Sequence, residues 1–178
     1  MKQPLDFKAL AAHASWQHRK NILLSEGQRT WLRGNQSLTK QLIDYSQGDF
    51  KLQLLDEYRA KPYMHEMQAL GFDLQPECRI REVLLKCHGH ATVFARSIIT
   101  DQAIQASKHQ LIELGNVPLG HLLFKNAEVN LETRQIAKID LSKRSIFARR
   151  TLYNLNGENI LVSEFFLEDV WNNLTVDY

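Results

Sequence analysis

Two ionisable side chains lie in apolar stretches of this sequence, where either could act on a bound ligand. Arg81 falls in the run 79–87, which is rich in branched apolar residues and typical of a strand. Because side chains alternate along a strand, Arg81 shares a face with Val83, Leu85 and Cys87, and we expect that face to be buried. A buried guanidinium stays charged and needs an anion. That anion is either a carboxylate of the chain or the carboxylate of a ligand, held bidentately by the planar group.

Glu164 is the second such side chain, in the stretch 160–167 that reads as a strand. Its face also carries Ile160 and Val162, and the opposite face is apolar too, which indicates a central strand covered on both sides. A carboxyl group in such a setting requires a cation or a hydrogen-bond donor. Arg81 and Glu164 are therefore candidates for contacts with a ligand or, alternatively, for a structural pair with each other.

Other reactive residue types give weaker patterns. Cys87, His88 and His90 are too close in sequence to converge easily on a metal ion, and no second pair of ligands accompanies them, so we interpret them as part of a turn. Cys78 and Cys87 lie on one predicted strand, roughly 30 Å apart when it is extended, which is beyond the reach of a disulfide. We therefore expect neither a metal site nor a disulfide.

Two adjacent arginines stand in the predicted strand 145–155. Arg149 shares a face with Tyr153, and Arg150 shares the other face with Leu152. Both faces carry apolar residues, so exposure at the surface explains neither arginine well.

The elements that position these residues mix helices and strands. Ser37 can cap a helix over 38–45, and Gly115 stands where a helix over 101–114 would end in a left-handed residue. Asn156-Gly157 is typical of a tight hairpin. Helices and strands without βαβ alternation favour the α+β class with an antiparallel sheet. The predicted strands cover residues 50–58, 79–87, 91–99, 129–139, 145–155 and 160–167.

Three segments are less regular. Residues 1–30 are weakly patterned, a helix or a loop, and residues 31–34 are expected to end that segment. Residues 61–72 suit a short helix or a mobile flap, and residues 121–124 suit a helical turn. We expect a single domain over 1–178.

Composition narrows the possible classes of function. The chain has 178 residues, 44% of them hydrophobic, which is enough for one sizeable core. A net charge of +2 gives no broad basic surface for nucleic acid. No run of about 18 apolar residues predicts a membrane span, and the first residues lack the apolar core of a signal peptide, so we expect a cytoplasmic protein.

An ordered series of motifs resembles the bacterial chorismate pyruvate-lyase family. The resemblance covers roughly residues 30–170, and Pro118-Leu119-Gly120 and Glu164 are its most specific parts. A looser likeness extends to Trp31-Leu32 and Ser37-Leu38-Thr39-Lys40. The principal motifs are Arg81-Glu82-Val83-Leu84-Leu85, Ala95-Arg96-Ser97, Leu114-Gly115-Asn116-Val117-Pro118-Leu119-Gly120 with Leu123-Phe124, Arg149-Arg150 and Ser163-Glu164-Phe165-Phe166-Leu167.

This resemblance implies an enzyme of ubiquinone synthesis that converts chorismate into 4-hydroxybenzoate and pyruvate without a cofactor. It implies an antiparallel sheet with helices and flaps that bury the ligand. Substrate and product would be the only partners of what we expect to be a monomer, with no role for nucleic acid.

The resemblance also assigns roles to individual residues. Arg81 would bind the ring carboxylate, and Glu164 would contact the oxygen at the opposite end of the ring. Leu119 would contribute its backbone, and Leu38 would pack on the ring. Arg96, expected on the neighbouring strand, is our candidate for the enolpyruvyl carboxylate.

The chain departs from the family pattern at two positions, with Phe147 in place of Trp and Leu38 in place of Met. Two other classes of function compete with the enzyme. Effector domains of some bacterial regulators resemble this fold, but they normally follow a winged-helix domain of about 60–70 residues, for which the segment before Trp31 is too short. The other class is a structural domain in which Arg81 pairs with Glu164.

Overall fold

An antiparallel sheet forms the centre of the protein. The computed structural model describes residues 5–18, 22–74, 76–107, 110–112, 114, 115, 117–125 and 129–173. Across these residues seven strands pair in the order β1-β5-β6-β7-β4-β3-β2, which confirms the predicted α+β class. The strands are β1 (Gln17–His18), β2 (Phe50–Ala60), β3 (Cys78–Cys87), β4 (His90–Ile99), β5 (Val129–Asp140), β6 (Ser145–Leu155) and β7 (Glu158–Phe166).

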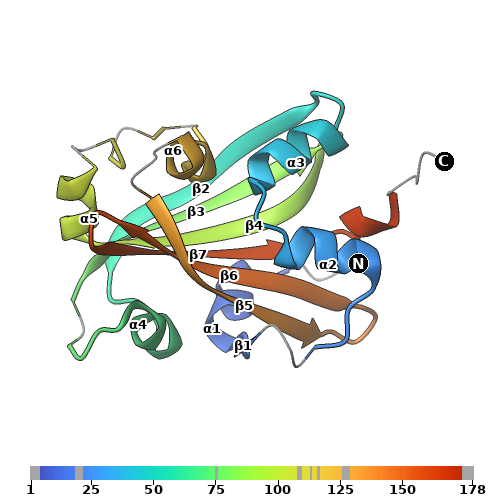
Figure 1. Ribbon diagram of the computed structural model, residues 1–178. Coiled ribbons are helices and arrows are strands. Elements are labelled where there is room, and N and C mark those ends of the chain that lie inside the picture. The colour runs from blue at the N-terminus through green and yellow to red at the C-terminus, as the bar shows by residue number, and fades with distance from the viewer. Residues whose placement is uncertain are drawn as a thin grey trace.

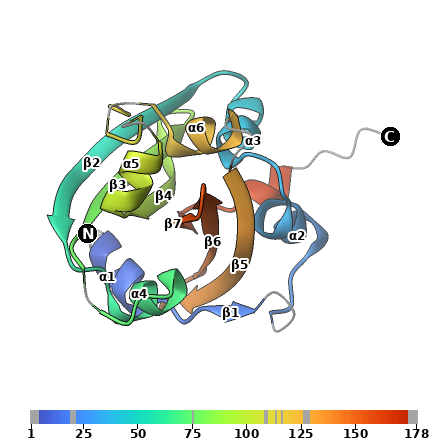
Figure 2. The same ribbon diagram turned by 60° about the vertical axis from the view of Figure 1, so that its left-hand side comes forward.

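Helices cover both faces of this sheet (Figures 1 and 2). The upper face in Figure 1, which includes Val83 and Val162, packs against α2, α3, α5 and α6. The lower face, which includes Leu84 and Phe165, is covered by α1 and α4. The helices are α1 (Phe7–His13), α2 (Glu26–Arg33), α3 (Leu38–Tyr45), α4 (Met64–Leu70), α5 (Asp101–Ala106) and α6 (Leu119–Lys125), with a final 3₁₀ turn η1 (Val170–Asn173).

Two tight turns set the register of the central strands. Asn156 and Gly157, with φ of 52° and 92°, join β6 to β7, as their sequence predicted. Counting back from this turn places Arg149 directly opposite Glu164. His88 and Gly89 make the corresponding turn between β3 and β4.

The helix predicted over 101–114 is much shorter than expected. Thr100 caps the start of α5, but the helix ends at Ala106. The hydroxyl of Ser107 donates to the carbonyl oxygen of Ile104 (2.7 Å) and accepts from the backbone N–H of Leu111 (3.3 Å), so it replaces bonds that a continuing helix would make. Residues 108, 109 and 113 lie outside the described residues. Gly115 is left-handed as predicted, with φ of 48°.

The prediction that residues 31–34 end the N-terminal segment is wrong for Trp31, Leu32 and Arg33, because they form the last turn of α2. Ser25 and Gln28 make a capping box at the start of this helix, and Gly34 ends it. Upstream, α1 and β1 give order to much of the weakly patterned N-terminal segment. The short helix expected within 61–72 is present as α4.

β2 is an outer strand of the sheet and is the most exposed of the long ones. It pairs with β3 along its whole length, except at a bulge between Leu54 and Asp56. After this extra residue Glu57 stands opposite Arg81, and the strand alternates from there in the shifted register. The bulge therefore places Glu57, and not Asp56, beside the candidate arginine.

Candidate active site

A small and largely covered cavity lies between the upper face of the sheet and the helices α3 and α6. Its volume is about 40 Å³. The floor comes from strands β2, β3, β4, β6 and β7, and the roof from α3 and the start of α6. Four residues predicted for the site line this cavity together, namely Leu38, Arg81, Leu119 and Glu164.

Arg81 forms one end of the cavity, and its side chain is 1% exposed. Its Nη1 donates to Glu57 Oε2 at 3.0 Å. Its Nη2 donates to the carbonyl oxygens of Gly115 (2.6 Å) and Val117 (3.3 Å), both in the loop that follows α5. No acceptor among the described residues bonds its Nε–H. The guanidinium is thus fixed in orientation while part of its donor capacity remains unused.

The charge around Arg81 is unbalanced. Glu57 also accepts a short hydrogen bond from Arg79, so two guanidinium groups share one carboxylate. Burial lowers the pKa of Arg81, and the attraction of Glu57 opposes that shift. An arginine remains protonated at neutral pH in any case. This end of the cavity therefore carries a net positive charge suited to an anion.

Glu164 lies towards the other end of the cavity, on β7. Its carboxylate accepts a short hydrogen bond from Nε of Arg149, the residue opposite it on β6. Nη1 of Arg149 donates to the carbonyl oxygen of Trp31 at 2.7 Å, which ties α2 to the pair. Glu164 is 8% exposed and Arg149 is fully buried. The negative charge of Glu164 is thus neutralised by Arg149, and a bound ligand does not need to supply a cation.

Arg81 and Glu164 do not form the ion pair that was the alternative to ligand binding. Arg81 stands opposite Ser97 on β4, whereas Glu164 stands opposite Ala95. β4 lies between them, and each of the two residues has another ionic partner. Because neighbouring strands are about 4.8 Å apart, the backbones of β3 and β7 are separated by roughly 10 Å at this point. The two charged groups therefore face the cavity from different sides.

Leu38 and Leu119 contribute the apolar roof. Leu38 begins α3, where Ser37 caps the helix as predicted, and Leu119 begins α6. The two helices approach closely, because a Cβ added to Gly120 would lie 3.3 Å from the hydroxyl of Thr39. Glycine at this position permits the contact that closes the cavity.

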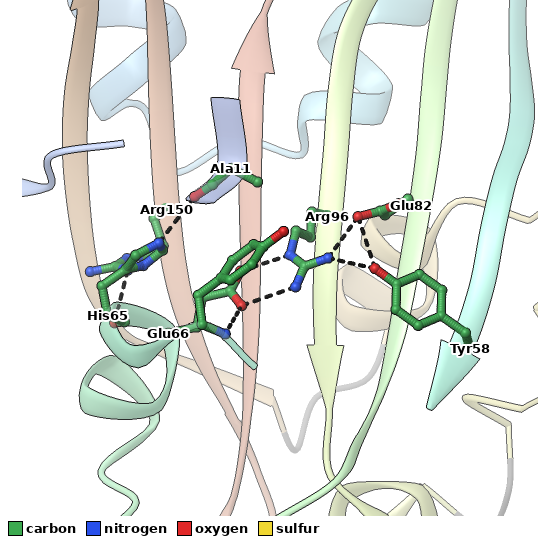
Figure 3. A network of polar contacts seen from close by, with 8 residues as sticks. Ala11, Tyr58, His65, Glu66, Glu82, Arg96 and Arg150 are labelled. Carbon is green, nitrogen blue, oxygen red and sulfur yellow. Dashed lines mark hydrogen bonds and ion pairs between the residues drawn. The ribbon is translucent and has the colours of Figure 1, made fainter. Parts of the chain in front are cut away.

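Arg96 is the one predicted site residue that the structure places elsewhere. It lies on the lower face, where its Nε and Nη2 bind Glu66 (2.8 and 3.1 Å) and its Nη1 binds Glu82 (2.6 Å) and the hydroxyl of Tyr58 (3.0 Å) (Figure 3). Burial alone would lower the pKa of Arg96, but the bonds to Glu66 outweigh it and raise the pKa. Alternation along β4 explains the correction, since the neighbours Ala95 and Ser97 face the cavity and Arg96 cannot.

The candidate site also includes three residues that were not predicted for it, namely Arg149, Glu57 and Tyr153. The signal for Arg149 was present, because the two-residue turn at 156–157 fixes its register with Glu164. Glu57 could not be placed without the bulge in β2. Burial raises the pKa of Tyr153, which lines the cavity and lies close enough to Glu164 to be affected by its charge.

The arrangement offers an anion-binding end, an apolar middle and a held carboxylate, all shielded from water. Within the described residues no three His, Cys, Asp or Glu side chains gather as a set of metal ligands. Cys78 and Cys87 are both free and buried. None of the described helices is long and apolar enough to cross a membrane.

Solved structures with a similar fold include bacterial regulators. A GntR-family transcriptional regulator from Bacillus cereus superposes with a TM-score of 0.50 and 8% identity, covering 67% of this chain and 92% of the other. The PhnF C-terminal domain gives a TM-score of 0.50 and 13% identity, covering 68% and 85%. At such low identity these likenesses concern the fold alone.

Similarity in sequence is much stronger to another group. A probable chorismate pyruvate-lyase from Pseudomonas putida is 32% identical over 160 residues, covering 86% of this chain and 88% of that protein. The protein of the same name from Pseudomonas syringae pv. tomato is 34% identical over 149 residues, covering 80% of each. The sequence model of the chorismate lyase family matches residues 10–176. The chain therefore belongs to the chorismate lyase family.

Proposed function

We propose that this protein is a chorismate pyruvate-lyase, which converts chorismate into 4-hydroxybenzoate and pyruvate. One observation supports this above all: Arg81 and Glu164 face the same closed cavity from different ends, in a chain of this family. We further propose that the reaction serves ubiquinone synthesis in the cytoplasm, and that the enzyme works as a monomer.

The unbalanced charge at Arg81 supports a position of the ring carboxylate at that end of the cavity. A ligand carboxylate would neutralise the second of the two guanidinium groups that share Glu57. The ring would then lie against Leu38 and Leu119, with its hydroxyl-bearing carbon towards Glu164. Arg96 has no part in this assignment, because its donors are committed to Glu66 and Glu82.

The reaction breaks the ether bond between the ring and the enolpyruvyl group. The ring carbon that bears the hydroxyl loses its hydrogen, the enolpyruvyl methylene gains one and becomes the methyl group of pyruvate, and the ring becomes aromatic. Aromatisation supplies the driving force, so the protein contributes positioning and a preorganised electrostatic environment. The hydrogen passes either directly to the methylene in a cyclic transition state or through Glu164 as an acid or base.

The small volume of the cavity indicates that the roof moves away from the sheet to admit substrate. At about 40 Å³ it is far smaller than the roughly 150 Å³ of an engineered cavity that binds benzene. The contact between Gly120 and Thr39 is where α3 and α6 would part. Closure over the substrate would exclude water from the reacting ether.

Incubation of purified protein with chorismate tests the proposal, with 4-hydroxybenzoate followed by absorbance and pyruvate by a coupled assay. We expect equal amounts of the two products, formed far faster than in the absence of protein. Binding of 4-hydroxybenzoate without any turnover would overturn the proposal in favour of a ligand-sensing module.

A further inference from the structure

The lower face of the sheet carries a second cleft, separate from the active site. Its volume is about 410 Å³, and it lies between the residues that follow α1, the helix α4 and the strands β5 and β6. Its polar lining consists of Ser15, Trp16, His65, Gln68, Gln135 and Arg150. None of these residues lines the active-site cavity, which is on the other side of the sheet.

Arg150 is the charged group of this cleft, and it is only 5% exposed. Its Nε (3.1 Å) and, in a shorter bond, its Nη2 both donate to Oε1 of Gln135. Its Nη1 donates to Nδ1 (2.9 Å) and to the carbonyl oxygen (3.1 Å) of His65 (Figure 3). All of these acceptors are neutral or part of a neutral residue, and no carboxylate of the described residues lies within ion-pair distance of Arg150.

The hydrogen bonds of His65 define its form. Its Nε2 lies 3.0 Å from the carbonyl oxygen of Ala11 and must donate to it, which leaves Nδ1 as an acceptor for Arg150. Burial lowers the pKa of His65, and the charge of Arg150 lowers it further. The imidazole is therefore neutral at pH 7 and does not balance the guanidinium.

The positive charge of Arg150 is thus uncompensated. Burial lowers its pKa to about 10, with only the attraction of Glu66 acting against the shift, so the group is still charged at neutral pH. The ring of Trp16 stacks on the guanidinium at 4.7 Å, which stabilises a cation without neutralising it. The indole Nε1 of Trp16 is also buried without an acceptor among the described residues.

We propose that this cleft is a binding site for a small carboxylate, held by Nε and Nη2 of Arg150. These two N–H groups form the edge of a guanidinium that receives a carboxylate bidentately. In the present structure the single amide oxygen of Gln135 occupies that edge, and a charged acceptor makes stronger bonds than an amide. Gln135 is half-buried on β5 and rotates aside when the carboxylate binds.

The site can be tested through the indole N–H of Trp16, because the chain has only three tryptophans and Trp16→Phe assigns the signal. The ¹⁵N-labelled protein is titrated with sodium acetate, with sodium chloride at equal ionic strength as the reference. We expect a saturable shift with acetate alone. Arg150→Gln should abolish it, and Arg81→Ala should leave it intact because that residue belongs to the other cavity.

Gln135→Ala adds a test that misfolding cannot imitate, because it predicts a gain of acetate affinity and not a loss. It removes the acceptor that competes with the ligand, so acetate should bind roughly threefold or more tightly than to the unmodified protein. Equal shifts with acetate and chloride, or unchanged acetate affinity in Gln135→Ala, would overturn the proposal. So would saturable binding of phosphate in the absence of acetate binding, because the assigned ligand class is a carboxylate.

Discussion

Arg81 and Arg96 are equally buried, at 1% and 2% exposure of their side chains, yet they stand in opposite electrostatic situations. On the lower face Arg96 binds two carboxylates, Glu66 and Glu82, which are themselves almost fully buried. On the upper face Arg81 shares a single, partly exposed carboxylate, Glu57, with another arginine and turns to backbone carbonyls for the rest of its bonds. Burial alone therefore does not distinguish an arginine suited to a ligand from a structural one. The number of protein carboxylates that balance its charge does.

Removal of Arg96 should produce the largest loss of stability. Arg96→Met leaves Glu66 and Glu82 buried without a cation, which should lower the free energy of unfolding by about 3–5 kcal/mol. Urea unfolding of the ligand-free protein measures this loss. The triple variant Arg96→Met, Glu66→Gln, Glu82→Gln should regain much of it, and a single variant as stable as the parent would contradict the structural role of Arg96.

Removal of Arg81 should instead weaken ligand binding. Arg81→Ala should reduce affinity for 4-hydroxybenzoate by at least about 30-fold, because the ligand carboxylate loses its cation. Stability should change little, since Glu57 keeps its bond to Arg79. Calorimetric titration and thermal melts measure the two effects, on protein freed of retained ligand because bound ligand raises apparent stability.

Arg79→Ala is the matched control, because it removes the other partner of Glu57 without touching the cavity. It should weaken binding of 4-hydroxybenzoate clearly less than Arg81→Ala does, because Arg81 keeps its donors to the ligand carboxylate although Glu57 then balances its charge. A large loss of stability in Arg81→Ala, with ligand affinity unchanged, would assign Arg81 the same structural role as Arg96.

Glu164→Gln separates the two routes for the ring hydrogen. We expect Glu164 to orient the ring oxygen, so affinity and turnover should weaken together, by less than about 100-fold. If the carboxyl group transfers a proton, turnover should fall by about 10²–10⁴-fold while 4-hydroxybenzoate still binds well. Single-turnover rates and product affinity, measured on the same preparation, distinguish the two outcomes.

The lower face should also respond modestly to acid. The pKa of His65 is lower in the folded than in the unfolded protein, so its contribution to stability is complete above the unfolded value of about 6.5 and is lost as the pH falls below it. His65→Gln keeps both hydrogen-bonding functions without titrating. Its free energy of unfolding should decline less than that of the parent between about pH 6.5 and 5, and parallel declines would refute the assignment.

Chelation should have the smallest effect of all, namely none. The polar side chains that line the cavity are an arginine, a carboxylate already paired with Arg149 and the hydroxyls of Thr39, Ser97 and Tyr153. Such a set does not hold a divalent metal well, and aromatisation does not call for a Lewis acid. Activity on chorismate should therefore be the same with and without EDTA. Loss of activity in EDTA, reversed by one divalent metal, would be the contrary result.

Much of this architecture follows from local sequence signals. Alternation along 79–87 and 160–167 predicted which faces Arg81 and Glu164 occupy, and Asn156-Gly157 fixed the hairpin that pairs Glu164 with Arg149. Ser37 gave the start of α3. These features depend on neighbours in sequence, so the sequence contains the information directly.

The predictions failed where the structure depends on contacts between residues that are far apart in the sequence. The face of Arg96 was predictable from alternation, but its two carboxylates come from α4 and β3 and could not be anticipated. The helix expected through residue 114 ends early because Ser107 bonds to the backbone and the later loop supplies the Gly115 carbonyl to Arg81. The helical pattern of the sequence does not reveal that the carbonyl oxygen of Gly115 accepts a hydrogen bond from Arg81.

The bulge in β2 has a further consequence for the behaviour of many copies together. A long outer strand exposes a row of unpaired backbone groups onto which a strand of another molecule can add. The irregularity between Leu54 and Asp56 breaks that row, and the charged side chains of Lys51 and Arg59 flank it. At the other edge, β1 covers only two residues of β5. The same extra residue that brings Glu57 to Arg81 thus also disfavours edge-to-edge association of the sheets of different copies into fibres.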